Sequence, residues 1–276
     1  LPSYGAITIE ALHIMEAFPD SLFDGTDWAR VIYHAISAAY LDRAGDLPIE
    51  DADRLTSKAW AQKRALETGL LSSKALPSES SNTELPPAWT DPVGHTTHLT
   101  VVDRNGMVVA LTQTVGPIMG SKVATPGLGF IYAATLGGYL GEMKAGQRAA
   151  SHISPLIVMK DGKPILALGA AGGSRIPSAV VAITSRVIDQ GYSLDKALAL
   201  PRVYPVEKGI DLEWTGDNGW SVQDSSYLAG LNYKVFITRR PGMFGRSNSV
   251  MLDTLKGEWI GASDPDWEGS AASPKN

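Results

Sequence analysis

The chain has 276 residues, of which 44% are hydrophobic and 19% are charged, and its net charge is -5. These values are typical of a folded protein with a substantial core, and they exclude wholesale disorder. A nucleic-acid-binding protein of this size is usually basic, so we expect no nucleic-acid partner. The charge is uneven, because residues 1–95 carry 14 acidic and 7 basic side chains while residues 96–276 carry 15 and 17.

Cysteine is absent from the chain, which excludes disulfides, thiol nucleophiles and cysteine-bound metals. No apolar run approaches the roughly 20 residues of a membrane span, so we expect none in this segment. The chain starts at Leu1 rather than at a methionine, and we therefore expect it to be part of a longer, processed or trimmed protein. The sequence leaves the compartment open between a periplasmic or extracellular location and the cytoplasm.

Helical spacing of apolar residues predicts three helices in the first part of the chain, over about residues 7–18, 27–44 and 51–69. Thr26 or Asp27 is expected to cap the second helix.

The stretch that follows is rich in serine, proline and small polar residues, which predicts an exposed, mobile linker over about residues 71–95. The domain division expected from this pattern is residues 1–95, ending in the linker, and residues 96–276.

From residue 96 onward the pattern becomes β. Two β-branched segments, 97–102 and 107–112, flank an Asn-Gly turn, which predicts a hairpin. Further elements are expected in this order: a second hairpin over 156–168, a helix near 179–189, a short helix from Ser193, a helix near 223–231, and strands near 234–238, 248–252 and 258–261. Helices followed by hairpins interleaved with helices predict an α+β fold with antiparallel sheets.

A glycine-rich turn follows the second hairpin. Gly172 and Gly173 either aim backbone N–H groups into a cleft, as an oxyanion hole requires, or form only a tight strand-to-helix turn. Ser193 lies in a Ser-x-x-Lys sequence, but its position before an apolar helix favours an N-cap. His95 and His98 would point to opposite faces of an extended segment, which argues against a shared metal ion.

The segment Gly-His-Thr-Thr-His-Leu-Thr at 94–100 joins the linker to the first strand. A threonine in this position becomes a nucleophile if the bond before it is cut, because the new α-amine, with a pKa of about 7.7–8.0, is a base next to the hydroxyl. Two threonines that simply begin a strand are common, and the pattern alone favours this second interpretation.

Several long segments in the same order resemble one known family. The sequence TTHLTVVDRNGMVVALTQT is similar to the start of the small subunit of γ-glutamyltranspeptidases. PLIVMKDGKPILALGAAGGSRI, ALPRV and IGASDP resemble further segments of that subunit, and residues 1–70 resemble the last helices of the large subunit. The resemblance covers essentially the whole chain.

This resemblance implies an N-terminal-nucleophile (Ntn) hydrolase: a four-layer αββα sandwich with two antiparallel sheets, incomplete here without the N-terminal half of the large subunit. It implies that Thr96 is the nucleophile and that Thr114 hydrogen-bonds its amine or hydroxyl. Gly172 and Gly173 would supply oxyanion N–H groups, and Ser151 matches the first serine of a pair that holds the substrate carboxylate. No cofactor and no metal ion are implied.

Four positions depart from the family pattern. Gly116 stands where the family has an asparagine, and Thr135 and Gly138 align with the glutamine and aspartate that hold the amino group of glutamate. His152 replaces the second serine, and it either takes over part of this clamp or fills a pocket wall. Since buried charged hydrogen bonds contribute strongly to recognition, we expect specificity to differ from that for γ-glutamyl substrates.

The expected function is an autoprocessed threonine-nucleophile amidohydrolase or acyltransferase that cleaves an amide through an acyl-enzyme on Thr96. One alternative is a genuine γ-glutamyl transferase or glutathione hydrolase with a rearranged clamp. Another is an uncleaved, inactive relative that acts as a binding or structural subunit. The expected partners are a small-molecule amide and the rest of the precursor or a large-subunit chain, which would complete a heterodimer.

Overall fold

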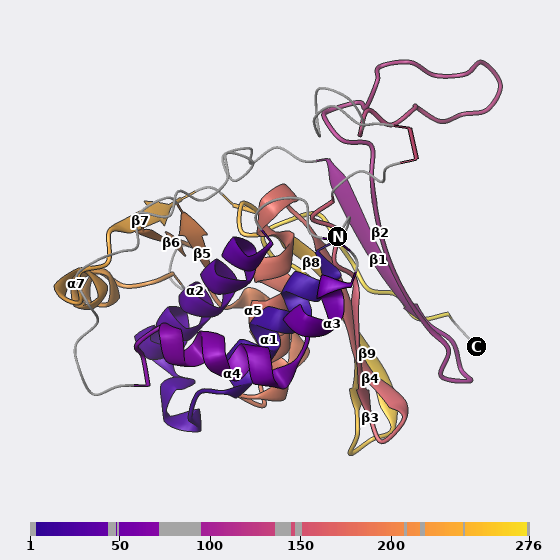
Figure 1. The fold of residues 1–276 in the computed structure, drawn as a ribbon. Helices are drawn as coiled ribbons and strands as arrows, with labels where there is room; N and C mark the ends of the chain where they lie inside the picture. Colours follow the sequence, from indigo (N-terminus) through magenta and orange to yellow (C-terminus); the bar gives the residue numbers. More distant parts are fainter. Residues whose placement is uncertain are drawn as a thin grey trace.

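The computed structural model of the chain describes residues 4–43, 48, 50–71, 95–135, 145–146, 151–206, 209–215, 219–239 and 241–274 (Figure 1). The helices within these residues are α1 (Gly5–Glu16), α2 (Gly25–Asp42), α3 (Asp51–Leu55), α4 (Lys58–Glu67), α5 (Ile176–Ile188), α6 (Leu194–Ala199) and α7 (Val222–Gly230). The strands are β1 (Thr96–Val102), β2 (Val108–Thr114), β3 (Leu156–Lys160), β4 (Lys163–Ala171), β5 (Val203–Val206), β6 (Gly209–Glu213), β7 (Val235–Thr238), β8 (Arg246–Asp253) and β9 (Glu258–Ser263).

The N-terminal helices follow the predicted pattern with two local differences. Helix α2 is capped by Asp24, whose side chain accepts a hydrogen bond from Gly25 N, rather than by Thr26 or Asp27. The single helix expected over 51–69 is divided into α3 and α4, because the Ser57 side chain accepts from the Trp60 N–H at 3.2 Å and starts a new helix.

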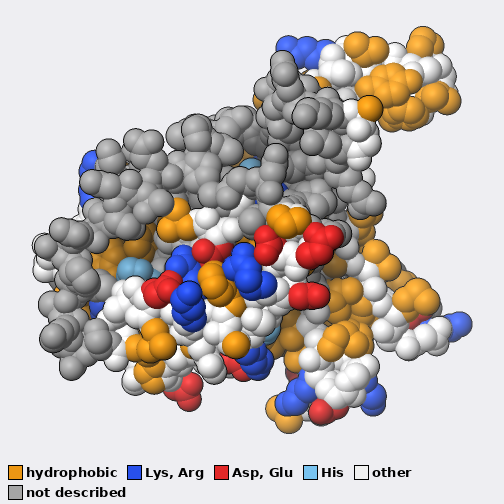
Figure 2. Space-filling model, viewed as in Figure 1, with side chains coloured by type: hydrophobic (Ala, Val, Ile, Leu, Met, Phe, Trp, Pro, Cys, Tyr) orange, Lys and Arg blue, Asp and Glu red, His pale blue; other side chains and the backbone are white. Residues whose placement is uncertain are grey.

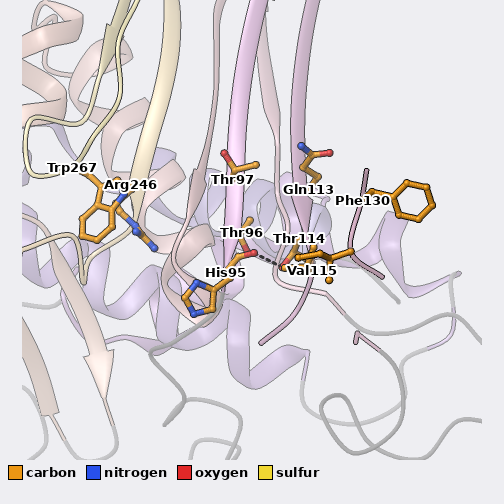
Figure 3. Close-up of a pocket in the computed structure, with 10 residues that line it drawn as sticks. His95, Thr96, Thr97, Gln113, Thr114, Val115, Phe130, Arg246 and Trp267 are labelled. Atoms are coloured by element: carbon orange, nitrogen blue, oxygen red, sulfur yellow. Dashed lines mark hydrogen bonds between the residues drawn. The ribbon is translucent and has the colours of Figure 1, made fainter. Parts of the chain in front are cut away.

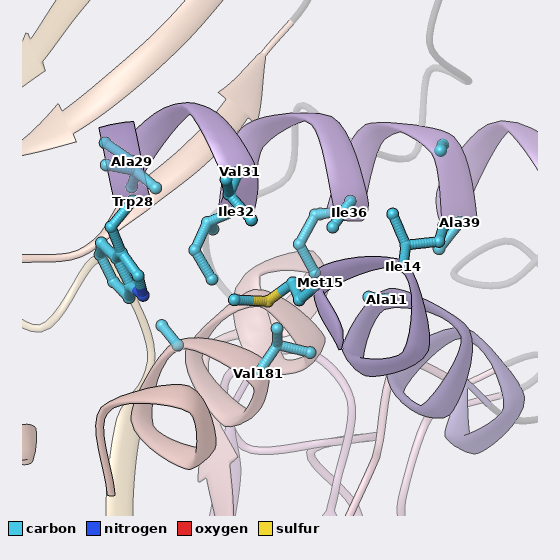
Figure 4. Close-up of a cluster of buried hydrophobic side chains, with 14 of the residues drawn as sticks. Ala11, Ile14, Met15, Trp28, Ala29, Val31, Ile32, Ile36, Ala39 and Val181 are labelled. Atoms are coloured by element: carbon cyan, nitrogen blue, oxygen red, sulfur yellow. The ribbon is translucent and has the colours of Figure 1, made fainter. Parts of the chain in front are cut away.

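The larger hydrophobic core lies where α1, α2 and α5 meet (Figure 4). Ile14 and Met15 of α1 pack with Ile32 and Ile36 of α2, and Val181 of α5 joins the same cluster. The helices before residue 70 therefore share one core with a helix of the C-terminal region, and the two regions form one folded unit.

The predicted first hairpin is confirmed as β1 and β2, which pair in antiparallel register with Thr96 opposite Thr114. The Asp103 side chain stabilises the turn by accepting hydrogen bonds from the N–H groups of Asn105 and Met107, both at 2.8 Å. The fixed turn sets the register, so Thr96 and Thr114 are brought together at the far end of the hairpin.

The central sheet has the strand order β3-β4-β8-β9, and all of its neighbouring strands are antiparallel. Along β4, Leu166 and Leu168 pack against helices α5 and α6, while the alternate residue Gly169 contacts His98 of β1. The helices and the β1–β2 hairpin thus cover opposite faces of the same sheet, which gives a helix–sheet–sheet sandwich.

The hairpin's two faces have an unusual distribution of side chains. The face on the central sheet carries threonines and His98, whereas Leu99, Val101, Val109 and Leu111 on the outer face are each 40–54% exposed. Figure 2 shows hydrophobic side chains along this edge of the molecule. An exposed apolar sheet face of this kind is typical of a surface that another chain or segment covers.

A third sheet, β5-β6-β7, contains two strands that were not predicted, β5 and β6, and one pair of strands that is not antiparallel. Strands β5 and β6 are antiparallel, but β6 and β7 are parallel. The reason is the connection: α7 lies between β6 and β7, and a helical crossover returns the chain in the same direction.

The α+β class is confirmed, with antiparallel pairing in the hairpin and the central sheet. The described residues form three layers: the helices, the central sheet and the β1–β2 hairpin. They do not form the fourth layer of the expected αββα sandwich. Among those residues, no helix is long and apolar enough to cross a membrane. The predicted linker falls mainly on residues 72–94, which are outside the described part of the chain.

Candidate active site

A pocket of about 550 Å³ lies at the end of the hairpin where Thr96 and Thr114 face each other (Figure 3). It is lined by residues of β1, β2, the loop after β2, the start of β8 and the segment after β9: His95, Thr96, Thr97, Gln113, Thr114, Val115, Phe130, Ile131, Arg246 and Trp267. Both threonines predicted to take part in catalysis therefore line one pocket.

The peptide bond between His95 and Thr96 is held in place by the neighbouring strand. Thr114 Oγ1 donates a hydrogen bond to the His95 carbonyl oxygen at 3.1 Å, and the same hydroxyl accepts from Gly116 N at 3.0 Å. The His95 N–H donates to the Gly116 carbonyl at 3.1 Å. The predicted partner of Thr114 was the Thr96 amine or hydroxyl, but in the continuous chain Thr114 instead contacts the carbonyl of the predicted scissile bond.

The glycine pair predicted to bind an oxyanion lies at the same end of the sandwich. Gly172 directly follows β4, and the register places the last residue of β4, Ala171, opposite Arg246, which lines the pocket with Thr96. Gly172 and Gly173 have φ angles of +150° and +58°, which favour glycine. Neither N–H donates a backbone hydrogen bond to any other described residue, so both are available for a ligand oxygen.

The turn after these glycines is fixed by buried polar groups from distant elements. The Tyr40 hydroxyl of α2 donates to the Ser174 carbonyl at 2.5 Å, and the Tyr204 hydroxyl donates to Ser174 Oγ at 3.0 Å. Arg175 stacks on the Tyr204 ring and pairs with Asp211 at 2.9 Å. A helix from before residue 95 and a strand from after it thus hold the same turn.

His98 connects the hairpin to the central sheet and is buried between them. Its Nδ1 lies 2.7 Å from Thr112 Oγ1, and its ring fills the space beside Gly169. Burial lowers the pKa of His98 to about 4, so the ring is neutral at neutral pH. No group of three or more metal-binding side chains occurs in the part of the chain that the structure describes.

Replacing Gly169 by alanine should lower the free energy of unfolding by about 1–3 kcal/mol. A methyl group at this position would lie 2.4 Å from His98 Cε1, so β1 would have to move away from the sheet. Urea denaturation measures the change. The matched control is Gly230→Ala, because a methyl group there contacts nothing within 4 Å and should be neutral or slightly stabilising. Equal stability of the two variants would contradict close packing of His98 on Gly169.

The positions predicted to set specificity are only partly brought together. Gly116 has a φ of +83°, and a Cβ atom there would lie 2.8 Å from the Ala134 oxygen and 3.3 Å from Thr135 Cγ2. The loop backbone therefore occupies the space that an asparagine side chain would need. Gly138 lies outside the described residues.

Ser151 and His152 are not among the residues that line the Thr96 pocket. Ser151 Oγ accepts from Ile153 N at 3.3 Å, and the His152 ring packs on the Tyr4 ring with centroids 4.5 Å apart. Burial, and secondarily Arg43, lowers the pKa of His152 to about 4, so this ring carries no charge at neutral pH. A role of either residue in substrate binding stays a prediction.

Two pocket residues were not identified from the sequence. Arg246 is the first residue of β8, and Trp267 follows the segment IGASDP near the end of the chain. Their side chains stack, with the Arg246 guanidinium carbon 4.1 Å from the Trp267 ring centroid. No local sequence pattern indicates contact between residues 21 positions apart. The nearby IGASDP segment, which resembles a family motif, was the one signal that residues near the C-terminus could lie at the site.

Comparison with known proteins identifies the same family along almost the whole chain. The family model described as gamma-glutamyltranspeptidase matches residues 1–273. The glutathione hydrolase proenzyme of Escherichia coli (strain K12) is 31% identical over 96% of this chain and 48% of its own length. The acylase ACY 1 proenzyme of Pseudomonas sp. (strain V22) is 31% identical over 91% of this chain and 45% of its own length. The chain thus spans about half the length of these curated relatives.

Solved structures agree on the fold. Cephalosporin acylase from Bacillus halodurans superposes on 100% of this chain and 50% of its own, with a TM-score of 0.78 at 22% identity. A Helicobacter pylori gamma-glutamyltranspeptidase T380A mutant matches 62% of this chain and 100% of the compared chain, with a TM-score of 0.54 at 27% identity.

Proposed function

Because the chain belongs to the gamma-glutamyltranspeptidase family, we propose that it is the catalytic part of a threonine-nucleophile amidohydrolase or acyltransferase. The family comprises enzymes, and its curated relatives include both glutathione hydrolase and acylase proenzymes. The observation that carries the proposal is the position of Thr96: it lies in a pocket with Thr114, at the end of the sandwich that also holds the Gly172–Gly173 turn.

The first step of the proposed reaction is self-cleavage at His95–Thr96. The Thr96 hydroxyl attacks the His95 carbonyl carbon, the C–N bond breaks, and the nitrogen takes the proton from the hydroxyl. Water then hydrolyses the resulting ester and leaves Thr96 with a free α-amine. The Thr114 hydroxyl stabilises the negative charge that develops on the carbonyl oxygen, because it already donates to that oxygen at 3.1 Å.

Turnover follows the same chemistry on a substrate amide. The Thr96 amine accepts the hydroxyl proton while the oxygen attacks the acyl carbon, and the Gly172 and Gly173 N–H groups stabilise the oxyanion. The amine part leaves with that proton, and an acyl-enzyme remains on Thr96. Water or an acceptor amine then releases the acyl group.

The mature N-terminus tests this proposal directly. Intact-mass analysis of the purified protein should give a fragment that begins at Thr96. A chain that stays intact after long incubation and hydrolyses no amide would support the inactive binding subunit instead.

Replacing Thr114 by valine should slow cleavage at His95–Thr96 by roughly 100-fold, because the isosteric side chain removes one donor from the scissile carbonyl. A time course of precursor and fragments on denaturing gels measures the rate. Thr254→Val is the matched control, since Thr254 is exposed in the turn after β8. If Thr114→Val cleaves as fast as the control, the Thr114 hydroxyl has no part in the cleavage step.

We further propose that the acyl specificity differs from that for γ-glutamyl groups. The support is chemical: Gly116, Thr135 and Gly138 have no charged or amide side chain with which to hold the α-amino group of glutamate. A panel of 4-nitroanilides with γ-glutamyl, glutaryl and unsubstituted aliphatic acyl groups should show a lower kcat/KM for γ-glutamyl than for at least one other acyl group. A clear preference for γ-glutamyl would instead support a glutathione hydrolase with a rearranged clamp.

The proposed partner is the remaining part of the precursor, covering the outer face of the hairpin. This face carries four exposed apolar side chains on β1 and β2, and the relatives are about twice as long as this chain. The missing part would supply the fourth layer of the sandwich.

A further inference from the structure

Arg246 is placed beside the reaction centre by the central sheet. It begins β8 opposite Ala171, the residue just before Gly172, and it lines the pocket that contains Thr96. Figure 3 shows its side chain extending from the Trp267 side toward His95 and Thr96. Among the described residues that line this pocket, Arg246 is the only lysine, arginine, aspartate or glutamate. This lining therefore carries a positive charge and no carboxylate.

The charge of Arg246 is not neutralised by the described residues. The acid that interacts electrostatically with Arg246 is Asp264, but its carboxylate is bound to other groups. Asp264 Oδ2 pairs with Arg202 at 2.6 Å, and Oδ1 accepts a hydrogen bond from Asp266 N. The buried Arg246 Nε has no hydrogen-bond partner within the described ranges. Partial burial lowers the pKa of Arg246 through loss of hydration. A partly buried cation without a counter-ion is costly, and an anionic ligand would relieve this cost.

The guanidinium is held in one orientation. It stacks on the Trp267 ring at 4.1 Å, and the turn at Gly242 packs on both side chains: a Cβ atom there would lie 3.0 Å from Trp267 Cε3 and 3.1 Å from Arg246 Cδ. Stacking occupies the face of a guanidinium but leaves its N–H edges free for a carboxylate. Trp267 is 54% exposed, so its ring can also contact a planar ligand.

We propose that Arg246 and Trp267 form a subsite for the leaving amine of the substrate, and that this amine carries a carboxylate on a flat or aromatic group. The inference rests on the proposed function, in which Thr96 attacks an amide. The family resemblance implies that Ser151 holds the carboxylate on the acyl side of the substrate, and neither Ser151 nor His152 lines this pocket. The Arg246 subsite therefore serves the other half of the amide.

Binding of the product amine tests the subsite without turnover. Isothermal titration of the mature enzyme with 4-aminobenzoate and with its neutral analogue 4-aminobenzamide should give at least tenfold tighter binding of the carboxylate. Arg246→Gln should remove this preference by weakening the binding of 4-aminobenzoate about tenfold. Unchanged binding of 4-aminobenzamide to this variant would show that the pocket is still folded. Arg246→Lys should lose part of the preference, because lysine keeps the charge but not the planar edge. The matched control is Arg104→Gln, an exposed arginine in the turn of the hairpin.

A kinetic comparison assigns the subsite to the leaving group. With the acyl group preferred in the panel above, the 3-carboxy-4-nitroanilide should have a lower KM than the 4-nitroanilide, and Arg246→Gln should raise the KM of the carboxylated compound alone while kcat changes little. Equal binding of the two amines, or a preference that survives in Arg246→Gln, would overturn the proposal. Because titration needs no turnover, an enzyme that binds the carboxylate but hydrolyses no amide would reject the proposed function and keep the anion subsite.

Discussion

Replacing Thr96 by alanine will leave the chain uncut at His95–Thr96 and lower kcat/KM by at least about 10,000-fold. The reason is that both proposed steps use the same oxygen, which first attacks the His95 carbonyl and then the substrate amide. The fold should be retained, because Thr96 is only partly buried at the end of β1 and alanine keeps its backbone hydrogen bonds. Intact mass measures the cleavage, and anilide hydrolysis measures the turnover.

The neighbouring threonine supplies the control for this experiment. Thr97 is exposed, and its side chain alternates to the outer face of the hairpin. Thr97→Ala should therefore still be cut before residue 96, and Thr96→Ser should be cut at a reduced rate because serine keeps the hydroxyl. Cleavage of Thr96→Ala at the normal position would show that another group is the nucleophile of self-processing.

The parts of the fold that depend on short-range signals were predictable. The Asn-Gly turn at 105–106 sets the register of β1 and β2, and that register alone places Thr96 opposite Thr114. The sequence left two interpretations of the Gly172–Gly173 pair open, because a glycine pair before a helix fits an oxyanion site and an ordinary turn alike. The place of this turn in the fold depends on long-range pairing, since β8 pairs with β4 and places Arg246 opposite Ala171, the residue before Gly172.

The features that sequence reasoning missed arise from contacts between distant segments. Tyr40 fixes the Ser174 carbonyl from 134 positions away, and nothing in the helical pattern of α2 distinguishes this tyrosine from other core residues. The same holds for the stacking of Arg246 on Trp267. The parallel pairing of β6 and β7 was missed for a different reason, since short strands have no pattern that gives their direction. Only the intervening helix α7 determines it.

A buried ion pair gives the largest expected effect on stability. Arg202 and Asp264 are 2% and 3% exposed, and the guanidinium lies 2.6 Å from the carboxylate. Replacing Asp264 by alanine should lower the free energy of unfolding by about 3–5 kcal/mol, because the buried guanidinium loses the carboxylate that is hydrogen-bonded to it and keeps only the more weakly coupled acids Glu213 and Asp266. Urea denaturation of the mature protein measures this change.

An exposed ion pair of the same length provides the comparison. Lys58 and Glu16 are also 2.6 Å apart, but their side chains are 65% and 56% exposed, so Lys58→Ala should cost less than about 1 kcal/mol. If Asp264→Ala is no less stable than Lys58→Ala, burial does not make the Arg202 pair more important than a surface pair.

The same substitution should also reduce catalysis through the position of the Gly172–Gly173 turn, the proposed oxyanion site. Arg202 donates to the Gly245 carbonyl at 2.6 Å, and Gly245 lies so close to Gly172 that a Cβ atom on Gly172 would be 2.9 Å from the Gly245 Cα. Loss of Asp264 releases the arginine that holds this backbone contact, so kcat of the folded fraction should fall while KM changes less. If stability and kcat fall together, the C-terminal IGASDP segment supports the glycines proposed to bind the oxyanion. An unchanged kcat would limit the ion pair to a role in folding.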